Sequence, residues 1–191
     1  MSKKYIEDET FERIDFSENT LEKADYEKCM FVNCNFSTCD LSSLNFIECV
    51  FLECNLSLAS ISQTSFKDVQ FKNCKLLGLH FDMCNAFLFV VSFDNCMLNL
   101  SSFYKLKLKK TKFKNCSLHE VDFSATDLTE AVFEQCDLLG AIFQNSILEK
   151  TDFRTAFNFS FDPELNIMKK AKFSLQGIAG LLHKYQIEIE N

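Results

Sequence analysis

The chain has 191 residues, including 22 Phe, ten Cys and only four Gly, and its formal net charge is −7. This length fits a single domain, and the negative balance argues against a direct nucleic-acid partner because phosphate binding needs a basic surface. The chain opens with polar and acidic residues where a secretion signal would be apolar. Its longest apolar run, AFLFVV at 86–91, is far shorter than the ~20 residues that cross a bilayer. We therefore expect a soluble, cytoplasmic protein without a membrane partner.

A six-letter pattern of the form Phe-x-x-Cys-x-Leu or Phe recurs along the chain. Its copies begin at residues 31, 51, 71, 93, 113 and 133, so the step is 20 residues except for one step of 22. A period of five lies inside this unit, because every fifth residue from Phe11 to Phe81, and again from Phe93 to Phe153, is large and apolar. Five fits neither an α-helix nor a flat strand. Four pentads forming one square turn of a solenoid explain both periods.

All ten cysteines fall at one position of the pentads, two residues before the centre, a position that also holds Asn19; the centre is Phe or Leu for nine of them and Ala86 for Cys84. This placement predicts that Cys serves as a small buried side chain beside each large one. Disulfides are not expected, because stacked Cβ vectors run parallel and a cytoplasmic chain keeps its thiols reduced. Spacings of five and 20 also differ from the closely spaced Cys pairs of zinc sites. We expect neither a metal nor a cofactor.

The single 22-residue step predicts a small bulge near residues 82–92 within a repeat domain that spans residues 1–175. The residue before Cys in the six copies is Asn in four, Gln in one and Glu in one. Amides stacked at one corner of a coil can form a ladder of side-chain hydrogen bonds.

Residues 176–191 form the second predicted unit, a C-terminal helix and strand. The pentads weaken after Phe153, where Asp162-Pro163 indicates a turn, and Phe173 returns in register 20 residues after Phe153. Helical spacing follows, with Ser174 as a candidate N-cap, and IEIE at 187–190 alternates as a strand does. This unit either caps the last coil or forms a dimer interface. The candidate interface residues are Leu175, Ile178, Leu181, Leu182, Tyr185, Ile187 and Ile189.

Residues typical of catalysis are scarce. The three histidines have no partner spaced as in a catalytic triad, and no phosphate-binding loop or zinc-protease motif is present. We therefore expect a protein that is not an enzyme. The charged stretches, six lysines within 105–114 and acids concentrated in 7–27 and 119–152, are either solvated faces or partner surfaces.

The pentads, for example ATDLTEAVF at 125–133, resemble the A(D/N)LxX signature of pentapeptide repeat proteins over residues 9–175. This resemblance implies an all-β fold, a right-handed quadrilateral β-helix. The Cys-rich pentads, CNLSLASISQTSF at 54–66 and the ending AKFSLQGIAGLLHKYQIEIE at 171–190 are similar to a topoisomerase-protecting subgroup. That subgroup includes Qnr-type quinolone-resistance proteins and immunity proteins against albicidin and microcin B17.

The narrower resemblance implies a function as well as a fold. It implies a homodimer joined through its C-terminal helix and strand, whose acidic rod mimics duplex DNA and binds DNA gyrase or topoisomerase IV. The alternative is an interaction scaffold with a partner that is not a topoisomerase. The acidic candidates for partner contact are Asp122, Asp127, Glu130, Glu134 and Asp137.

Overall fold

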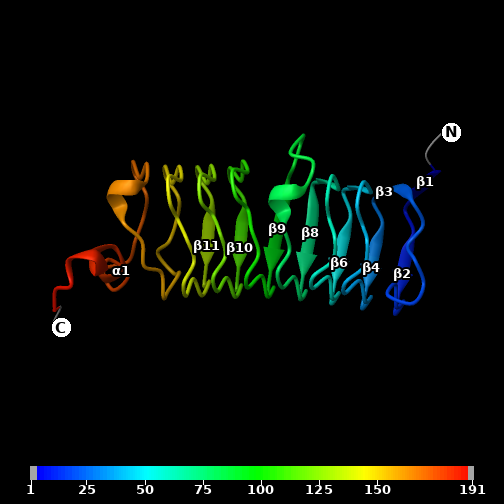
Figure 1. Cartoon of the computed structure of the whole chain (residues 1–191), viewed down its shortest axis with the longest axis horizontal. Coiled ribbons are helices and arrows are strands. Elements are labelled where there is room, and N and C mark those ends of the chain that lie inside the picture. Colours follow the sequence, from blue (N-terminus) through cyan, green and yellow to red (C-terminus); the bar gives the residue numbers. More distant parts are fainter. Residues whose placement is uncertain (1–3, 189–191) are drawn as a thin grey trace.

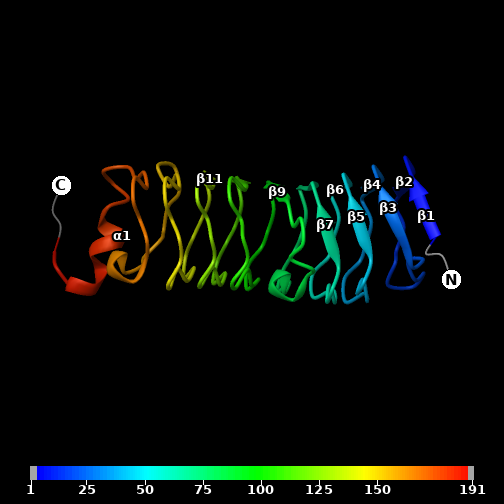
Figure 2. The same cartoon turned by 90° about the horizontal axis from the view of Figure 1, so that it is seen from above.

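The computed structural model describes residues 4–188 as a rod of stacked coils, with the two ends of the chain at opposite ends of the rod (Figure 1, Figure 2). Short parallel strands in successive coils form two sheets along its length. The four-stranded sheet contains β1 (Lys4–Glu7), β3 (Ala24–Glu27), β5 (Asn45–Ile47) and β7 (Ser65–Lys67). The seven-stranded sheet contains β2 (Thr10–Glu12), β4 (Met30–Val32), β6 (Val50–Leu52), β8 (Val69–Lys72), β9 (Val91–Asp94), β10 (Lys112–Lys114) and β11 (Val132–Glu134).

The pairing register confirms the predicted solenoid. Phe31 pairs with Phe51 and Phe51 with Phe71, each a step of 20 residues, and Phe71 then pairs with Phe93, the step of 22. Each residue therefore stacks on the residue at the same position of the next coil. The fold is the expected right-handed quadrilateral β-helix.

Each coil has four faces, which we name in chain order from the seven-stranded sheet. Face A is that sheet, and face D carries the four-stranded sheet and its continuation through Lys107, Asp127, Ile147 and Ile167. Face B follows face A and contains the bridged column Asp15, Asn35, Asn55, Lys75, Met97, Ser117, Asp137 and Phe157. Face C contains the bridges from Asp40 to Ser60 and along His80, Ser102, Asp122 and Ile142.

Large side chains at the pentad centres fill the interior of the rod. Rings at equivalent positions stack on one another, as for Phe113 on Phe133, whose centroids are 4.9 Å apart with planes 2° from parallel. Rings on opposite faces meet edge-on in the interior, as do Phe103 of face C and Phe113 of face A. Both arrangements are favourable for aromatic pairs, and each fully buried ring contributes roughly 1.5–3 kcal/mol.

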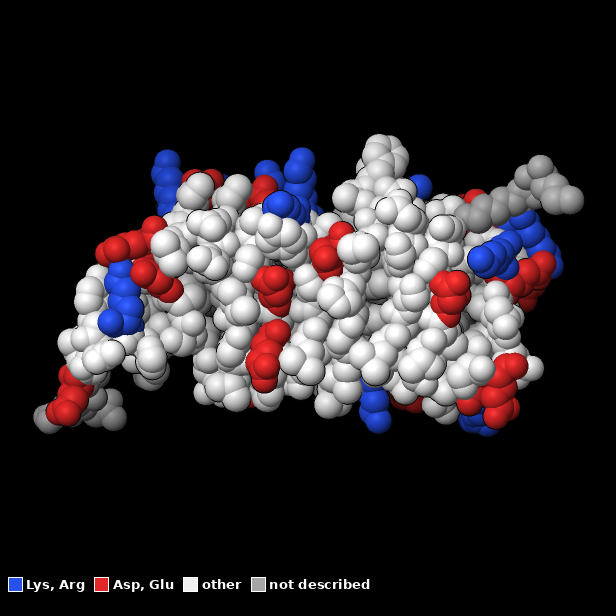
Figure 3. All heavy atoms as spheres, in the orientation of Figure 1, with Lys and Arg blue, Asp and Glu red and all other residues white. Residues whose placement is uncertain are grey.

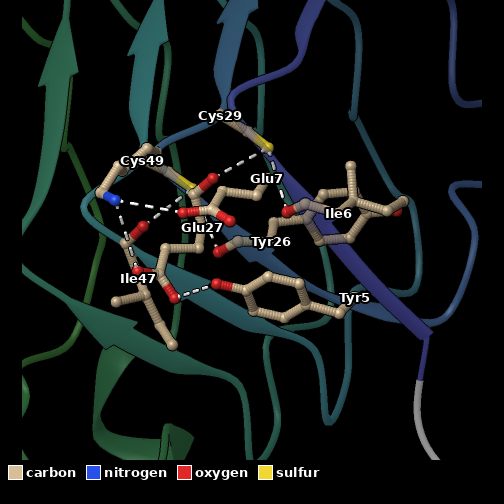
Figure 4. A network of polar contacts seen from close by, with 9 residues as sticks. Tyr5, Ile6, Glu7, Tyr26, Glu27, Cys29, Ile47 and Cys49 are labelled. Atoms are coloured by element: carbon tan, nitrogen blue, oxygen red, sulfur yellow. Dashed lines mark hydrogen bonds and ion pairs between the residues drawn. The ribbon is translucent and has the colours of Figure 1, made fainter.

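The small side chains two residues before the centres form hydrogen bonds between successive coils. The Cys54 thiol donates to the Phe31 carbonyl of the preceding coil at 3.3 Å. Thr64 Oγ1 donates to the Leu41 carbonyl, and Ser146 Oγ to the Phe123 carbonyl, both at 2.8 Å. Figure 4 shows the same contacts for Cys29 and Cys49. Cys is therefore a weak buried donor that Ser and Thr can replace, a role that small size alone did not predict.

Two positions of this column differ from the prediction. Cys39 is half-buried, whereas the other nine thiols are buried, and none is in a disulfide. Asn19 is exposed, because its backbone turns back and its N–H donates to the Asp15 carbonyl at 3.1 Å.

The corners between faces use left-handed backbone. The residue two after almost every centre has a φ near +55°, for example Asn33, Asn73 and Asn95. Asn tolerates this region better than other side chains with a Cβ. Asn95 Nδ2 donates to Asn73 Oδ1 at 2.7 Å, which is one rung of the expected amide ladder. A second ladder lies on face B, where Asn55 donates to Asn35 and Asn35 to Asp15.

The two extra residues of the long step form a knob that projects from the rod (Figure 1). After the 3₁₀ turn η1 (Phe81–Met83), Phe87 and Leu88 are 68% and 60% exposed, while Phe89 occupies the core position. The rings of Phe81 and Phe89 are in edge-on contact. The knob leaves the coil within residues 82–92, and Phe89 rather than Ala86 continues the interior.

The C-terminal segment closes the rod beyond the last coil. It contains η2 (Pro163–Leu165), α1 (Ala179–Leu182) and η3 (His183–Tyr185). Ser174 Oγ accepts the Gly177 N–H at 3.0 Å in the turns that precede α1, whereas the N-cap of α1 itself is Ile178, which has no side-chain cap bond. Residues Ile187 and Glu188 are not in a strand, and Ile189 lies outside the described residues.

Substitution of Cys74 tests the inward register. Cys74→Arg should destabilise the protein by more than about 4 kcal/mol, because it places an unpaired charge in the coil. Cys74→Ser should cost less than about 2 kcal/mol, because a hydroxyl can donate to the Phe51 carbonyl as the thiol does. Chemical denaturation measures both values, and an Arg variant as stable as the Ser variant would contradict the register.

Candidate interaction surfaces

The candidate sites of the described residues lie on the surface of the rod. Within residues 4–188, no group of three or more His, Cys, Asp or Glu side chains is arranged to hold a metal ion. A hollow on face A is lined by Phe93 and Phe113 and bordered by the side chains of Lys112, Lys114 and Asp94. None of the helices in these residues is long and apolar enough to cross a membrane.

The five acidic residues expected to contact a partner lie around the rod and not on one side of it. Asp122 is on face C and Asp137 on face B. Asp127 is on face D, Glu130 is at the corner between faces D and A, and Glu134 is on β11 of face A. Residues adjacent in an acidic stretch of sequence therefore point in different directions, because four pentads make one full turn.

Two of these carboxylates are already paired with lysines of neighbouring coils. Lys109 Nζ lies 3.2 Å from Asp127, and Lys150 Nζ lies 2.8 Å from Glu130. Their charge is locally compensated, so they are weaker candidates for contact with a basic partner. Asp137 instead lies 2.8 Å from His119 Nε2.

The net charge of the chain is concentrated on faces B and C. These faces are formed by residues 15–22, 35–42, 55–62, 75–82, 97–104, 117–124 and 137–144, which contain eight acidic residues and one lysine. The remaining nineteen acidic and nineteen basic residues of the chain balance. The acids are Asp15, Glu18, Glu22, Asp40, Asp82, Glu120, Asp122 and Asp137, and the base is Lys75.

Figure 3 looks onto face C, with face D along its upper border and face B along its lower border. Acidic side chains are scattered over this side, whereas most lysines stand out along the upper border. All six lysines of the 105–114 stretch are exposed, as the register predicted. Five of them lie on faces D and A or the corner between these faces. Lys105 lies at the corner between faces C and D, with its Nζ 4.7 Å from the centre of the Tyr104 ring of face C.

Hydrogen bonds keep part of the acidic side ionised. Bonds from Ser42 to Asp40, and from Ser17 and Asn35 to Asp15, lower the pKa of each carboxyl. The backbone N–H of Ser124 likewise donates to Asp122 at 2.8 Å. These bonds hold the carboxylates in fixed positions on the surface.

The C-terminal candidates separate into inward and outward residues. Leu181 packs against the core of the last coil, where it caps the solenoid. Leu175 is 83% exposed, and Ile178, Tyr185 and Ile187 are also exposed. Leu182 is half-buried and borders a surface hollow with Ile187. One segment thus contributes side chains both to a cap and to an open apolar surface.

Comparison with known proteins identifies the family. A model of pentapeptide repeats in eight copies matches residues 39–78, and a model of the pentapeptide repeat region matches residues 86–156. The chain is a pentapeptide repeat protein. Residues 79–85, which lie between the two matches, directly precede the knob that contains Phe87 and Leu88.

Solved pentapeptide repeat structures have the same fold. A trypsin-treated variant of QnrB1, a plasmid-mediated fluoroquinolone resistance protein, is 18% identical with a TM-score of 0.58, covering 100% of this chain and 96% of that one. HetL, involved in heterocyst differentiation regulation in the cyanobacterium Nostoc sp. strain PCC 7120, is 15% identical with a TM-score of 0.54, covering 90% and 88%. These identities indicate a shared fold alone. A search of curated protein sequences gives no match.

The buried thiols of this pentapeptide repeat protein should make it sensitive to alkali. Burial raises the pKa of Cys49 to about 12, against about 8.5 in an unfolded chain. Its stabilising contribution is full below the unfolded pKa and declines as the pH rises toward the folded one. The free energy of unfolding should therefore fall by up to about 2 kcal/mol between pH 7 and pH 10 because of this thiol, and thermal unfolding at each pH measures the change. The Cys49→Ser variant should lose less free energy of unfolding over this pH range than the wild type. An equal loss in the two proteins would contradict the burial of the thiol.

The exposed apolar residues of the C-terminal segment give a test of dimerisation. Leu175→Asp combined with Ile178→Asp should convert a dimer into monomers, because both side chains are exposed and lie outside the core. Sedimentation velocity measures the change. Leu139→Asp with Ile142→Asp is the control, because these residues are similarly exposed on the coils. A dimer that survives the first pair would exclude this interface.

Proposed function

We propose that this pentapeptide repeat protein is a non-enzymatic DNA mimic that binds DNA gyrase or topoisomerase IV. In this proposal it acts as a homodimer joined through its C-terminal segment, and it modulates the enzyme or protects it from quinolones or peptide toxins. The observation that carries the proposal is the acidic side of the rod, faces B and C, which contains eight acids and one lysine. Such a surface suits a protein groove that is itself basic because it binds DNA.

The shape of the rod supports the same function. Its coils repeat in register, and the acids of faces B and C lie toward both ends of the rod, whereas the three coils of 55–62, 75–82 and 97–104 contribute one acid and one lysine to these faces (Figure 3). In-register stacking places equivalent side chains ~4.8 Å apart along the axis. A long, regular, negatively charged surface is what a duplex presents to a DNA-binding protein.

The C-terminal segment supports a dimer. Leu175, Ile178 and Ile187 would be buried if a second copy covered the end of the rod. Two rods joined at that end would double the length of the acidic surface. The protein would then be cytoplasmic, where its partner enzyme acts.

The alternative is a scaffold whose basic partner is not a topoisomerase. The balanced charges of faces A and D favour it, because a partner that encircles the rod would meet lysines as well as acids. Pull-down from the host lysate separates the two functions: gyrase or topoisomerase IV subunits support the first, and another basic protein supports the second.

A supercoiling assay with a face-specific control tests the proposal. The wild type should change gyrase activity or its inhibition by a quinolone or albicidin. Asp40→Asn, Glu120→Gln and Asp122→Asn together should remove most of this effect, because they remove three of the eight carboxylates of faces B and C while the amides at positions 40 and 122 keep the turn hydrogen bonds.

The matched control neutralises three acids elsewhere. Glu48→Gln, Asp94→Asn and Glu134→Gln change the net charge equally, and these side chains have no ion-pair partner among the described residues. They should retain the wild-type effect. No effect of the wild-type protein at micromolar concentration, on activity or on poisoning, would remove the proposed function.

A further inference from the structure

The corner between faces B and C, which we call the B/C edge, displays two leucines to solvent. Leu58 is 66% exposed and Leu100 is 61% exposed. Both occupy the corner position of their coils, and Gly78 lies between them in the stack. Because they are two coils apart, their side chains are about 10 Å apart along the axis.

The backbone at these two corners makes leucine an unfavourable choice for folding. Leu58 has a φ of 58° and Leu100 a φ of 62°, in the left-handed region that favours Gly and Asn. Other corners of the rod use Asn, for example at Asn73 and Asn95. An exposed leucine in this conformation adds nothing to the core, so folding stability alone does not account for it.

Gly78 provides the space that positions the first leucine. A Cβ atom at Gly78 would lie 2.8 Å from Leu58 Cδ2, so the Leu58 side chain lies across the glycine of the next coil. Gly78 itself has a φ of +64°. The glycine therefore leaves space on the B/C edge that the Leu58 side chain occupies.

Further exposed apolar side chains surround this edge. Met97 on face B and Tyr104 on face C are 43% and 40% exposed, and they belong to the same coil as Leu100. Charged side chains of both signs border this apolar centre: Asp82 and Glu120, and also Lys75, which is bridged to Met97, and Lys105, whose Nζ lies 4.7 Å from the centre of the Tyr104 ring. An apolar centre with a charged rim is the usual composition of a protein–protein interface.

We propose that the B/C edge around Leu58 and Leu100 is the docking edge of the rod. Its occupant is a protein surface with two apolar depressions, bordered by Lys or Arg side chains that meet the acids of faces B and C. This inference rests on the proposed function where it takes gyrase as that protein. It adds an apolar component that charge mimicry of DNA does not require, because the two leucines supply contacts that persist at high salt.

Binding of immobilised gyrase tests the docking edge. Leu58→Asn with Leu100→Asn should weaken binding at least about tenfold with an unchanged salt dependence, because two apolar anchors are lost. The same variant should melt no lower than the wild type, because Asn relieves the left-handed corners. Loss of binding without loss of stability is the combination that a structural role does not give.

The control removes exposed apolar side chains from the other side of the rod. Met30→Asn with Ile167→Asn changes faces A and D, where these residues are 40% and 55% exposed. This control should bind within about twofold of the wild type. Leucine variants that bind as tightly as the wild type would overturn the proposal, as would an equal loss in the control.

A second probe separates this inference from the proposed function. If the wild type does not bind gyrase, the proposed function fails, and a peptide of alternating arginine and leucine then serves as the ligand. Binding by the wild type that Leu58→Asn with Leu100→Asn weakens supports the edge on its own. Peptide binding that is absent, or equal in the two proteins, overturns it.

Discussion

In-register stacking of coils is the constraint on which this structure depends. Because each residue lies directly over its equivalent in the next coil, every property of the rod is organised in columns. Rings stack on rings, as Phe113 does on Phe133, and the Cys54 thiol donates to the carbonyl of Phe31 one coil below. Backbone hydrogen bonds between coils complete the column at each corner. The interior needs neither disulfides nor metal, because large apolar side chains and paired donors fill it.

The same constraint distributes charge around the rod. Residues close in sequence point to different faces, whereas residues 20 apart share one. Acidic stretches of sequence therefore do not produce acidic surfaces by themselves. The lysines of 105–114 fall on faces D and A and their corners, where Asp127 and Glu130 pair with lysines, whereas faces B and C carry eight acids and one lysine. The regular stacking thus gives the rod two sides of different charge. A single acidic side suits a partner that contacts the rod from one direction.

Much of the fold could be predicted from the sequence, because a period of five repeated over many coils leaves little freedom. The centres, the thiol column and the site of the inserted residues all follow from it. The choice of Phe89 over Ala86 for the interior could not be predicted, since it depends on how the knob leaves the coil. Helical spacing could not show that Leu181 points inward and Leu175 outward, because docking of the cap decides this. The register of the repeat is sufficient to predict that charge is uneven around the rod. The five acids chosen because they are close in sequence instead lie on all four faces: Asp122, Asp127, Glu130, Glu134 and Asp137.

In the proposed complex, a basic protein partner binds faces B and C and makes apolar contacts along the B/C edge. Hydroxyl-radical footprinting of the chain in complex with gyrase reports directly on this claim, because it reads the solvent exposure of individual side chains. We expect Met97, Leu100 and Tyr104 to become protected, while Met30 on face A and Ile167 on face D remain as reactive as in the free protein. Protection of Met30 and Ile167, with Met97, Leu100 and Tyr104 unchanged, would contradict the account.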